Sequence, residues 1–172
     1  MQTGYVQVYT GNGKGKTTAM LGLALRACGA GMRVYIGQFI KNGEYSEVKA
    51  VRECLSNVEL EQYGAEIDFC GDVTEEDIKS AEDGLKKAAE AILSGKYDIV
   101  MLDEINIAIH CGLINVKEVL ELIRQKPDSL ELILTGRYAV KEIIEAADLV
   151  SEITEIKHYY DKGIMAREGI EQ

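Results

Sequence analysis

A glycine-rich segment near the start of the chain has the residue types needed to bind phosphate groups. Residues 11–18 read Gly-Asn-Gly-Lys-Gly-Lys-Thr-Thr and follow an alternating apolar stretch at residues 5–9. Glycines let backbone N–H groups converge on an anion, and a helix expected to begin near Thr17 directs its positive end to the same place. Lys16 adds a charge for the terminal phosphate oxygens, and Thr17 offers a hydroxyl ligand for Mg²⁺. The predicted nucleotide-binding residues in this segment are Gly11, Asn12, Gly13, Lys14, Gly15, Lys16, Thr17 and Thr18.

The loop is one residue shorter than the standard phosphate-binding motif. The standard spacing would place its first glycine at position 10, which is Thr10, whereas the nearest glycine is Gly11. A shorter loop still forms an anion-binding nest, and it can hold a nucleotide differently from an ordinary ATPase. A glycine-rich turn that binds nothing is the competing interpretation. The preceding strand, the Lys-Thr pair and the following helix together argue against it.

Charged residues follow two of the later strands that the sequence predicts. Asp103 and Glu104 come directly after an apolar strand at residues 97–102, and Arg137 follows another strand at residues 130–134. Because ligands of open α/β sheets collect beyond the carboxyl ends of the strands, we expect both groups beside the nucleotide. The carboxylates would reach Mg²⁺ directly or through water, and the guanidinium would suit phosphate oxygens. The alternatives are solvated turn residues for the carboxylates and a surface salt bridge for the arginine.

Two phenylalanines lie in segments predicted near the carboxyl ends of the strands. Phe39 ends the strand predicted at residues 33–39, where it either faces a ligand or belongs to the core. Phe69 lies in residues 64–73, which contain glycines and no helical period and therefore form a predicted loop. At this edge of the sheet such a loop is either a substrate-facing flap or an ordinary surface connection.

Strands and helices alternate along the whole chain. At 172 residues, we expect one domain covering residues 1–172, with a three-layer phosphate-loop α/β fold and a mostly parallel central sheet. The strand predicted at residues 97–102 is apolar throughout, which favours a central position in the sheet. The predicted strands are residues 5–9, 33–39, 58–63, 97–102, 130–134 and 149–153, and the predicted helices are residues 17–27, 45–55, 74–92, 105–111, 116–126 and 140–147.

Composition narrows the classes of partner and compartment. The formal net charge of −10 argues against general nucleic-acid binding, which needs cationic surfaces. No apolar run reaches the length of a membrane span, and the N-terminus lacks the pattern of a secretory signal, so we expect a cytoplasmic protein. The four cysteines are far apart and form no Cys-x-x-Cys pair, which predicts neither a zinc site nor a disulfide framework.

Taken together, the motifs resemble those of the cob(I)alamin adenosyltransferases of the corrinoid type, also called ATP:corrinoid adenosyltransferases. The first motif alone would indicate only a nucleotide-binding protein, whereas the whole series in this order is specific and covers nearly the full chain. The segments that carry the resemblance are residues 10–18, Gly-Gln-Phe-Ile-Lys at 37–41, Leu-Asp-Glu-Ile-Asn at 102–106, Thr-Gly-Arg at 135–137, Ala-Asp-Leu-Val at 147–150, Ile-Lys-His at 156–158 and Arg-Glu-Gly-Ile at 167–170.

The resemblance implies an enzyme that transfers the 5′-deoxyadenosyl group of ATP to the Co(I) centre of a reduced corrinoid and releases triphosphate, in the synthesis or salvage of adenosylcobalamin. ATP would be the co-substrate, bound in a reversed sense, with Mg²⁺ or Mn²⁺ held by Thr17, Glu104 and Asp103. Lys16 and Glu104 would be the catalytic residues. The resemblance also implies a homodimer and a reduced flavoprotein as electron donor.

The resemblance further implies that a mobile loop excludes the lower cobalt ligand with apolar side chains. Many relatives carry Gly-Arg-Gly and then aromatic or apolar residues in that loop, whereas this chain reads Gly-Ala-Glu-Ile-Asp-Phe at residues 64–69. Phe69 is therefore the candidate for the apolar wedge, and Phe69 and Phe39 are the predicted corrinoid-facing residues.

Two other functions compete with adenosyl transfer. An ordinary phosphate-loop ATP hydrolase or small-molecule kinase would use Glu104 to orient water or a hydroxyl group and would release ADP. The shortened loop disfavours this alternative. A carrier that binds a corrinoid and a nucleotide without turnover is the other possibility, and its motivation is the altered sequence of residues 64–69.

Overall fold

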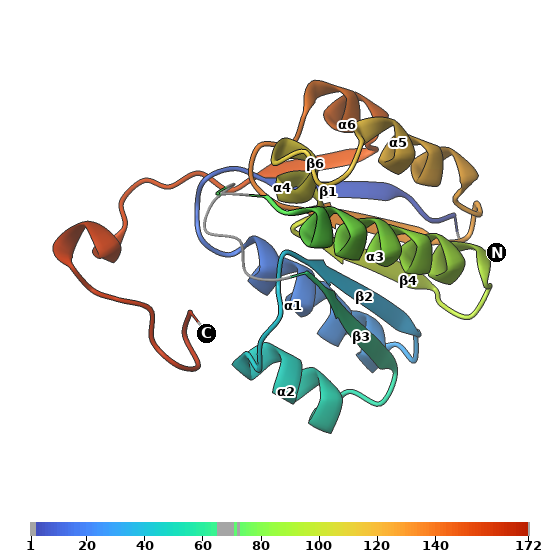
Figure 1. Ribbon diagram of the computed structural model, residues 1–172. Helices are drawn as coiled ribbons and strands as arrows, with labels where there is room; N and C mark the ends of the chain where they lie inside the picture. Colours follow the sequence, from blue (N-terminus) through green and yellow to red (C-terminus); the bar gives the residue numbers. More distant parts are fainter. Residues whose placement is uncertain (1–2, 65–70, 72, 172) are drawn as a thin grey trace.

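The computed structural model describes residues 3–64, 71 and 73–171 and forms a sheet of six parallel strands with helices on both faces (Figure 1). The strands are β1 Val6–Thr10, β2 Val34–Phe39, β3 Val58–Tyr63, β4 Ile99–Asp103, β5 Glu131–Thr135 and β6 Leu149–Glu152. The helices are α1 Lys16–Gly29, α2 Ser46–Cys54, α3 Glu75–Leu93, α4 Ile105–His110, α5 Val116–Gln125 and α6 Lys141–Ala146, followed by a 3₁₀ helix, η1, at Tyr159–Lys162.

The order of the strands places the carboxyl ends of β1, β2, β4 and β5 close together. The sheet runs β3-β2-β4-β5-β1-β6, so β4 and β5 are the two central strands. The register aligns the carboxyl ends of β2 and β4, with Gln38, the penultimate residue of β2, opposite Asp103, the last residue of β4. Tyr9 of β1 likewise pairs with Thr135 of β5. The segments that follow β1, β2, β4 and β5 therefore all emerge at one edge of the sheet.

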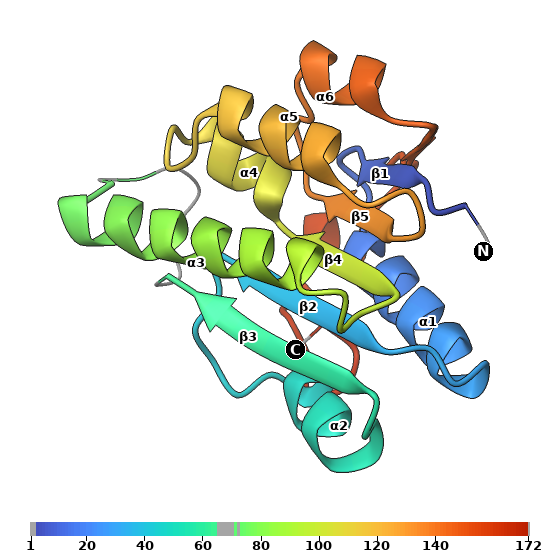
Figure 2. The same cartoon turned by 90° about the vertical axis from the view of Figure 1, so that its right-hand side faces the viewer.

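Each face of the sheet has its own apolar layer because neighbouring residues on a strand point to opposite faces. On β2, Tyr35 and Phe39 pack with the cluster under α3, α4 and α5, whereas Val34 and Ile36 pack with the cluster under α1. Figure 2 shows α3, α4 and α5 on one side of the sheet and α1 on the other. The three-layer α/β fold predicted from the sequence is thus confirmed.

The cysteines depart from the prediction based on their spacing. Cys28 and Cys54 carry free thiols, whereas Cys111 is disulfide-bonded. The prediction of no disulfide is therefore wrong at Cys111, because separation along the chain does not report distance in the fold. Among the residues that the structure describes, no helix is long and apolar enough to cross a membrane.

After β6 the chain leaves the sheet, passes through η1 and returns to the loop before α1 (Figure 1). We call residues 156–171 the C-terminal segment. Most of its side chains are exposed, and its contact with the loop is made by Ile170 and Glu171. The sequence predicted no structure for this part of the chain.

Candidate active site

The loop between β1 and α1 owes its shape to glycines that lie against the chain after β6. The Gly13 N–H donates to the Ile153 carbonyl oxygen at 2.7 Å. A Cβ atom would stand 2.5 Å from the same oxygen at Gly11 and 2.8 Å from it at Gly13, so side chains are excluded there. Gly15 has a φ of 117° and no described atom within 4 Å of an added Cβ, so the loop is open on the other side. That open side faces a cleft.

Lys16 and the start of α1 supply positive charge to this cleft. The Lys16 side chain is largely buried, and its Nζ donates to the Gly13 carbonyl oxygen at 2.8 Å. Burial lowers the pKa of the Lys16 ammonium. α1 begins without a side-chain cap from Gly15 and without an acidic residue in its first turn. Its first N–H groups are consequently available for an anion, as the sequence predicted for a phosphate loop.

Asp103, at the end of β4, is a completely buried hydrogen-bond acceptor. Its Oδ1 accepts from the Thr17 hydroxyl at 3.0 Å and from the Thr135 hydroxyl at 2.7 Å. Its Oδ2 accepts from Gln38 Nε2 at 3.1 Å and from Lys41 Nζ at 2.9 Å. These four donors occupy the acceptor sites of the carboxylate, so Asp103 orients the Thr17 hydroxyl rather than facing the cleft itself.

Glu104 differs from its neighbour because its carboxylate makes no hydrogen bond or ion pair with any described residue. The backbone turns sharply at this residue, with a φ of 58°, and the side chain lines the cleft. Burial, and after it the nearby charge of Asp103, raises the pKa of Glu104. Glu104 is therefore an acidic group at the cleft that protein cations do not neutralise by direct contact.

Thr17 and Glu104 fit a divalent cation that arrives with nucleotide phosphates. The Thr17 hydroxyl donates to Asp103, which leaves its oxygen lone pairs for a metal. In the described part of the chain, no group of three or more His, Cys, Asp or Glu side chains could hold a metal ion by itself. Mg²⁺ is commonly held by one or two carboxylates together with substrate phosphates, which agrees with this sparse set of protein ligands.

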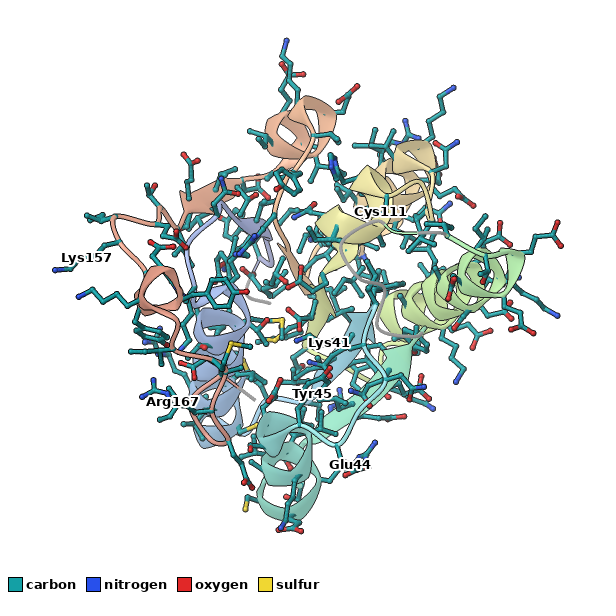
Figure 3. All side chains as sticks on the ribbon, turned by 60° about the vertical axis from the view of Figure 1, so that its left-hand side comes forward. Lys41, Glu44, Tyr45, Cys111, Lys157 and Arg167 are labelled. Atoms are coloured by element: carbon teal, nitrogen blue, oxygen red, sulfur yellow. The ribbon has the colours of Figure 1, made fainter. Side chains whose placement is uncertain are left out.

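The cleft has a volume of about 610 Å³ and combines residues from distant parts of the chain. Arg137, just after β5, lies on its wall as predicted. In Figure 3 this edge of the sheet is turned toward the viewer, with Lys41 near the centre. The residues that line the cleft include Gly13, Lys14, Gly15, Lys16, Thr17, Thr18, Lys41, Glu47, Glu104, Arg137, His158, Gly169, Ile170 and Glu171.

The C-terminal segment lines part of the cleft, and its Glu171 binds Lys14 of the loop, a contact that the sequence did not predict. Lys14 Nζ lies 3.1 Å from Glu171 Oε1 and donates to the Ile170 carbonyl oxygen at 3.0 Å. Arg167 and Tyr159 also donate to the Glu171 carboxylate. Arg167 is the main reason why the pKa of Glu171 lies far below its usual range. Lys14, which the sequence assigned to the nucleotide, is thus bound to this segment in the structure.

We expect Glu171→Gln to bind ATP a few-fold more tightly than the unmodified chain. The Glu171 carboxylate competes with phosphate oxygens for Lys14. Because this ion pair is exposed, it contributes little binding free energy and is screened by salt, so the expected gain in ATP affinity is small. Calorimetric titration with ATP at low and high salt would measure the effect. Glu168→Gln, which removes an exposed carboxylate from the same segment, is the matched control. Unchanged or weaker ATP binding by Glu171→Gln would contradict the competition.

The two phenylalanines predicted to face a corrinoid have different outcomes. The Phe39 ring is completely buried and packs against Tyr63 with the ring centroids 5.5 Å apart. A corrinoid contact by Phe39 would require exposed ring surface, so we do not include this residue in the proposed site. Phe69 lies outside the described residues.

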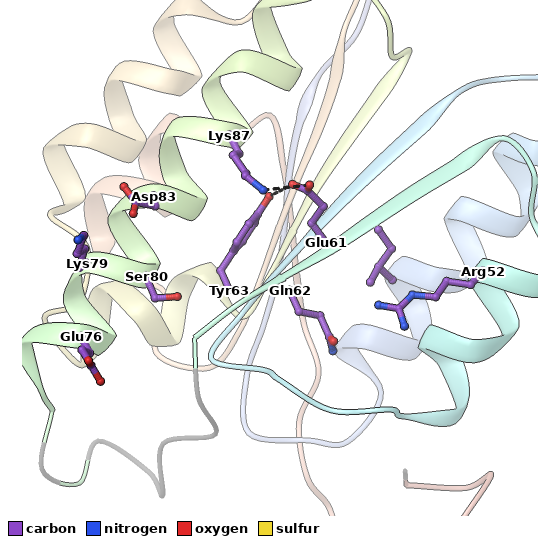
Figure 4. Close-up of a pocket in the computed structure, with 10 residues that line it drawn as sticks. Arg52, Glu61, Gln62, Tyr63, Glu76, Lys79, Ser80, Asp83 and Lys87 are labelled. Atoms are coloured by element: carbon purple, nitrogen blue, oxygen red, sulfur yellow. Dashed lines mark hydrogen bonds and ion pairs between the residues drawn. The ribbon is translucent and has the colours of Figure 1, made fainter.

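A second hollow of about 600 Å³ lies between β3 and α3, away from the phosphate loop (Figure 4). Glu61 accepts there from Lys87 at 3.1 Å and also from Tyr63. The charges of Glu61 and Lys87 at its centre are thus already paired with each other. We therefore place the chemistry in the cleft beside the loop.

Comparison with known proteins agrees with the geometry of this cleft. Residues 2–172 match a family described as ATP:corrinoid adenosyltransferase BtuR/CobO/CobP. A corrinoid adenosyltransferase of Pseudomonas aeruginosa is 35% identical over 171 residues, which cover 99% of this chain and 84% of that protein. One of Sinorhizobium is 36% identical over 173 residues, covering 99% and 81%. Corrinoid adenosyltransferase CobA of Salmonella typhimurium is 33% identical over 185 residues, covering 99% and 86%.

Proposed function

The chain belongs to the ATP:corrinoid adenosyltransferase family, and we propose on this basis that the cleft beside Lys16 binds ATP for attack by a reduced corrinoid. The Co(I) centre of the substrate attacks C5′ of ATP. A Co–C bond forms, the C5′–O bond breaks, and triphosphate leaves with the bonding electron pair. The relatives support this reaction by name, and none of the comparisons supports the alternative of a nucleotide hydrolase or kinase.

The main support for this proposal is a phosphate loop beside Glu104, whose carboxylate has no hydrogen bond or ion pair within residues 3–64, 71 and 73–171. Lys16 and the N–H groups of α1 are placed to receive the triphosphate, and Glu104 lies in the same cleft. Because Co(I) is itself the nucleophile, the protein needs no activated serine or cysteine. Its tasks are to align C5′ with cobalt and to stabilise negative charge on the leaving group.

We assign the charge-stabilising role to three kinds of donor. Lys16, the loop N–H groups and Arg137 bind the departing triphosphate, since all three line the cleft. Thr17 and Glu104 would hold Mg²⁺ or Mn²⁺, and Asp103 would contribute by fixing the Thr17 hydroxyl. A metal ion held there would supply positive charge opposite the phosphate oxygens. Lys14 joins these donors once the nucleotide has replaced Glu171 as its partner.

We also propose, from the family, a homodimer in the cytoplasm that receives its electron from a reduced flavoprotein. Sedimentation of the purified chain measures its oligomeric state. A dimer is the expected result, and a monomer would contradict the proposal. Replacement of the chemical reductant by a reduced flavodoxin-type protein tests whether a flavoprotein can supply the electron. Conversion of Co(II) corrinoid under those conditions supports electron transfer from a flavoprotein.

Phe69→Ala should slow the reaction from Co(II) corrinoid much more than the reaction from chemically prepared Co(I). An apolar wedge removes the lower cobalt ligand and so makes Co(II) easier to reduce, a step that Co(I) has already passed. Parallel rate measurements from the two starting states provide the comparison. An equal decrease of the rates from Co(II) and from Co(I) would show that Phe69 is not the apolar wedge.

Anaerobic mixing of the protein with Mg²⁺, ATP and Co(I) cobalamin tests the proposed function. We expect the visible spectrum to change to that of a light-sensitive alkylcobalamin while inorganic triphosphate accumulates. Corrinoid binding without spectral change would favour the carrier. Release of ADP would favour a hydrolase or kinase.

A further inference from the structure

The positively charged side chain of Lys41 lies where carboxylates from two elements, β4 and α2, converge. Its Nζ lies 2.9 Å from Oδ2 of Asp103, at the end of β4, and 3.9 Å from Oε1 of Glu47, in the first turn of α2. Burial opposes the charge of Lys41, but the charges of Asp103, Glu104 and Glu47 outweigh it and raise the Lys41 pKa. The Tyr45 ring also lies under the ammonium, 5.8 Å from Nζ to the ring centroid.

The backbone before Lys41 is held in a conformation that costs energy. Ile40 has a φ of 57°, which is unfavourable for a β-branched residue. The Ile40 N–H donates to the Tyr63 carbonyl oxygen at 2.9 Å, and this bond fixes the turn. Glu104, one of the acidic residues that line the cleft, has a similar left-handed φ of 58°. The two strained turns direct Lys41 and Glu104 to the same edge of the sheet.

We propose that the Lys41 ammonium is a built-in cation that occupies the place between Asp103 and Glu47 and so confines the nucleotide's divalent metal to Thr17 and Glu104. Lys41 is thus a positioning residue, which acts through Asp103. This inference rests on the proposed nucleotide site. Lys41 would determine that the metal ion binds Glu104 and not the neighbouring Asp103.

The contacts of Asp103 explain why a built-in cation would have this effect. Lys41 and Gln38 donate to Oδ2 and Thr135 donates to Oδ1, while the Thr17 hydroxyl lies 3.0 Å from Oδ1 and 3.3 Å from Oδ2. A metal ion could bind Asp103 only by displacing one of these donors from a completely buried group. Without the Lys41 ammonium, no cation would lie between the Asp103 and Glu47 carboxylates. Two carboxylates and the neighbouring Thr17 oxygen suit a hard divalent cation.

A simpler role for Lys41 would be direct contact with the nucleotide phosphates. The side chain is 19% exposed and lines the cleft, so such a contact is sterically open. The two roles differ in their effect on the protein without nucleotide. A phosphate contact leaves metal binding to the nucleotide-free chain unchanged, whereas a built-in cation blocks it.

Mn²⁺ binding to the full chain, measured by electron paramagnetic resonance without nucleotide or corrinoid, separates these roles. We expect Lys41→Met to bind Mn²⁺ at least about tenfold more tightly than the unmodified chain. The substitution removes the positive charge that pairs with the carboxylates and repels the metal ion. The double variant Lys41→Met with Asp103→Asn should lose the gain, and Lys41→Arg should bind as the unmodified chain does. Lys49→Met removes the same charge from an exposed position on α2 and is the matched control.

Equal Mn²⁺ affinity in Lys41→Met and Lys49→Met would overturn the inference. If Lys41→Met fails to fold because Asp103 is left unpaired, Lys41→Gln replaces it, since the amide keeps a hydrogen-bond donor but no charge. No gain in Lys41→Gln would overturn the inference equally. Because no substrate is present, a failure here is distinct from a failure of adenosyl transfer, which the reaction with Co(I) cobalamin reports.

Discussion

Lys16→Ala is expected to lower kcat/KM for ATP by about 10²–10³-fold, the range typical of removing one preorganised donor from a developing negative charge. The Lys16 ammonium is held beside the loop by the Gly13 carbonyl oxygen, so little reorganisation is needed when phosphate replaces that partner. Its burial makes the interaction stronger than it would be in water. Steady-state rates of triphosphate release with Co(I) cobalamin would measure the loss.

Lys117→Ala is the control for this substitution, because Lys117 is an exposed residue on α5, outside the cleft. It should retain the rate of the unmodified chain. If Lys16→Ala also retains that rate while remaining folded, the assignment of residues 11–18 to the triphosphate is wrong.

Glu104→Gln should lower turnover by about 10²-fold and at the same time make the folded chain more stable at neutral pH. Turnover falls because the amide is a poor ligand for Mg²⁺. Stability rises because burial and Asp103 raise the pKa of Glu104, so its ionised form opposes folding. The same group would then serve the reaction and cost stability.

The sign of the pH effect follows from the raised pKa. The folded state holds the Glu104 proton more tightly than the unfolded chain, where the pKa is near the ordinary value of 4.5. The stabilising contribution of the protonated group is complete below that value and is lost as the pH rises through the folded pKa. Melting temperatures of the two proteins should therefore agree in acid and diverge toward neutral pH, with Glu104→Gln higher. A lower melting temperature for the variant at neutral pH would contradict this account.

Local patterns in the sequence were sufficient for most of the fold. The predicted strand at residues 58–63 coincides with β3, and the apolar pattern of residues 97–102 correctly indicated a central strand, β4. Gly11 and Gly13 were predicted from their role in a loop, and the structure adds a steric reason in the nearby Ile153 carbonyl oxygen. These features depend on residues close in sequence.

Features that depend on distant residues could not be predicted. The pairing of Lys14 with Glu171 joins residues 157 positions apart, and no local pattern in the C-terminal segment indicated it. The neighbouring carboxylates Asp103 and Glu104 look equivalent in sequence, yet the donors that separate them come from other strands and loops. Phe39 shows the same limit, because its position at a strand end did not reveal that it points into the core.

We propose that a reduced corrinoid attacks C5′ of ATP held in the cleft beside Lys16. The most direct measurement uses ATP labelled with ¹³C at C5′, Co(I) cobalamin and Mg²⁺ under anaerobic conditions, followed by nuclear magnetic resonance. We predict that the label appears on the carbon bonded to cobalt and that inorganic triphosphate forms in equal amount. A label that remains in ADP, with no Co–C resonance, would contradict the account.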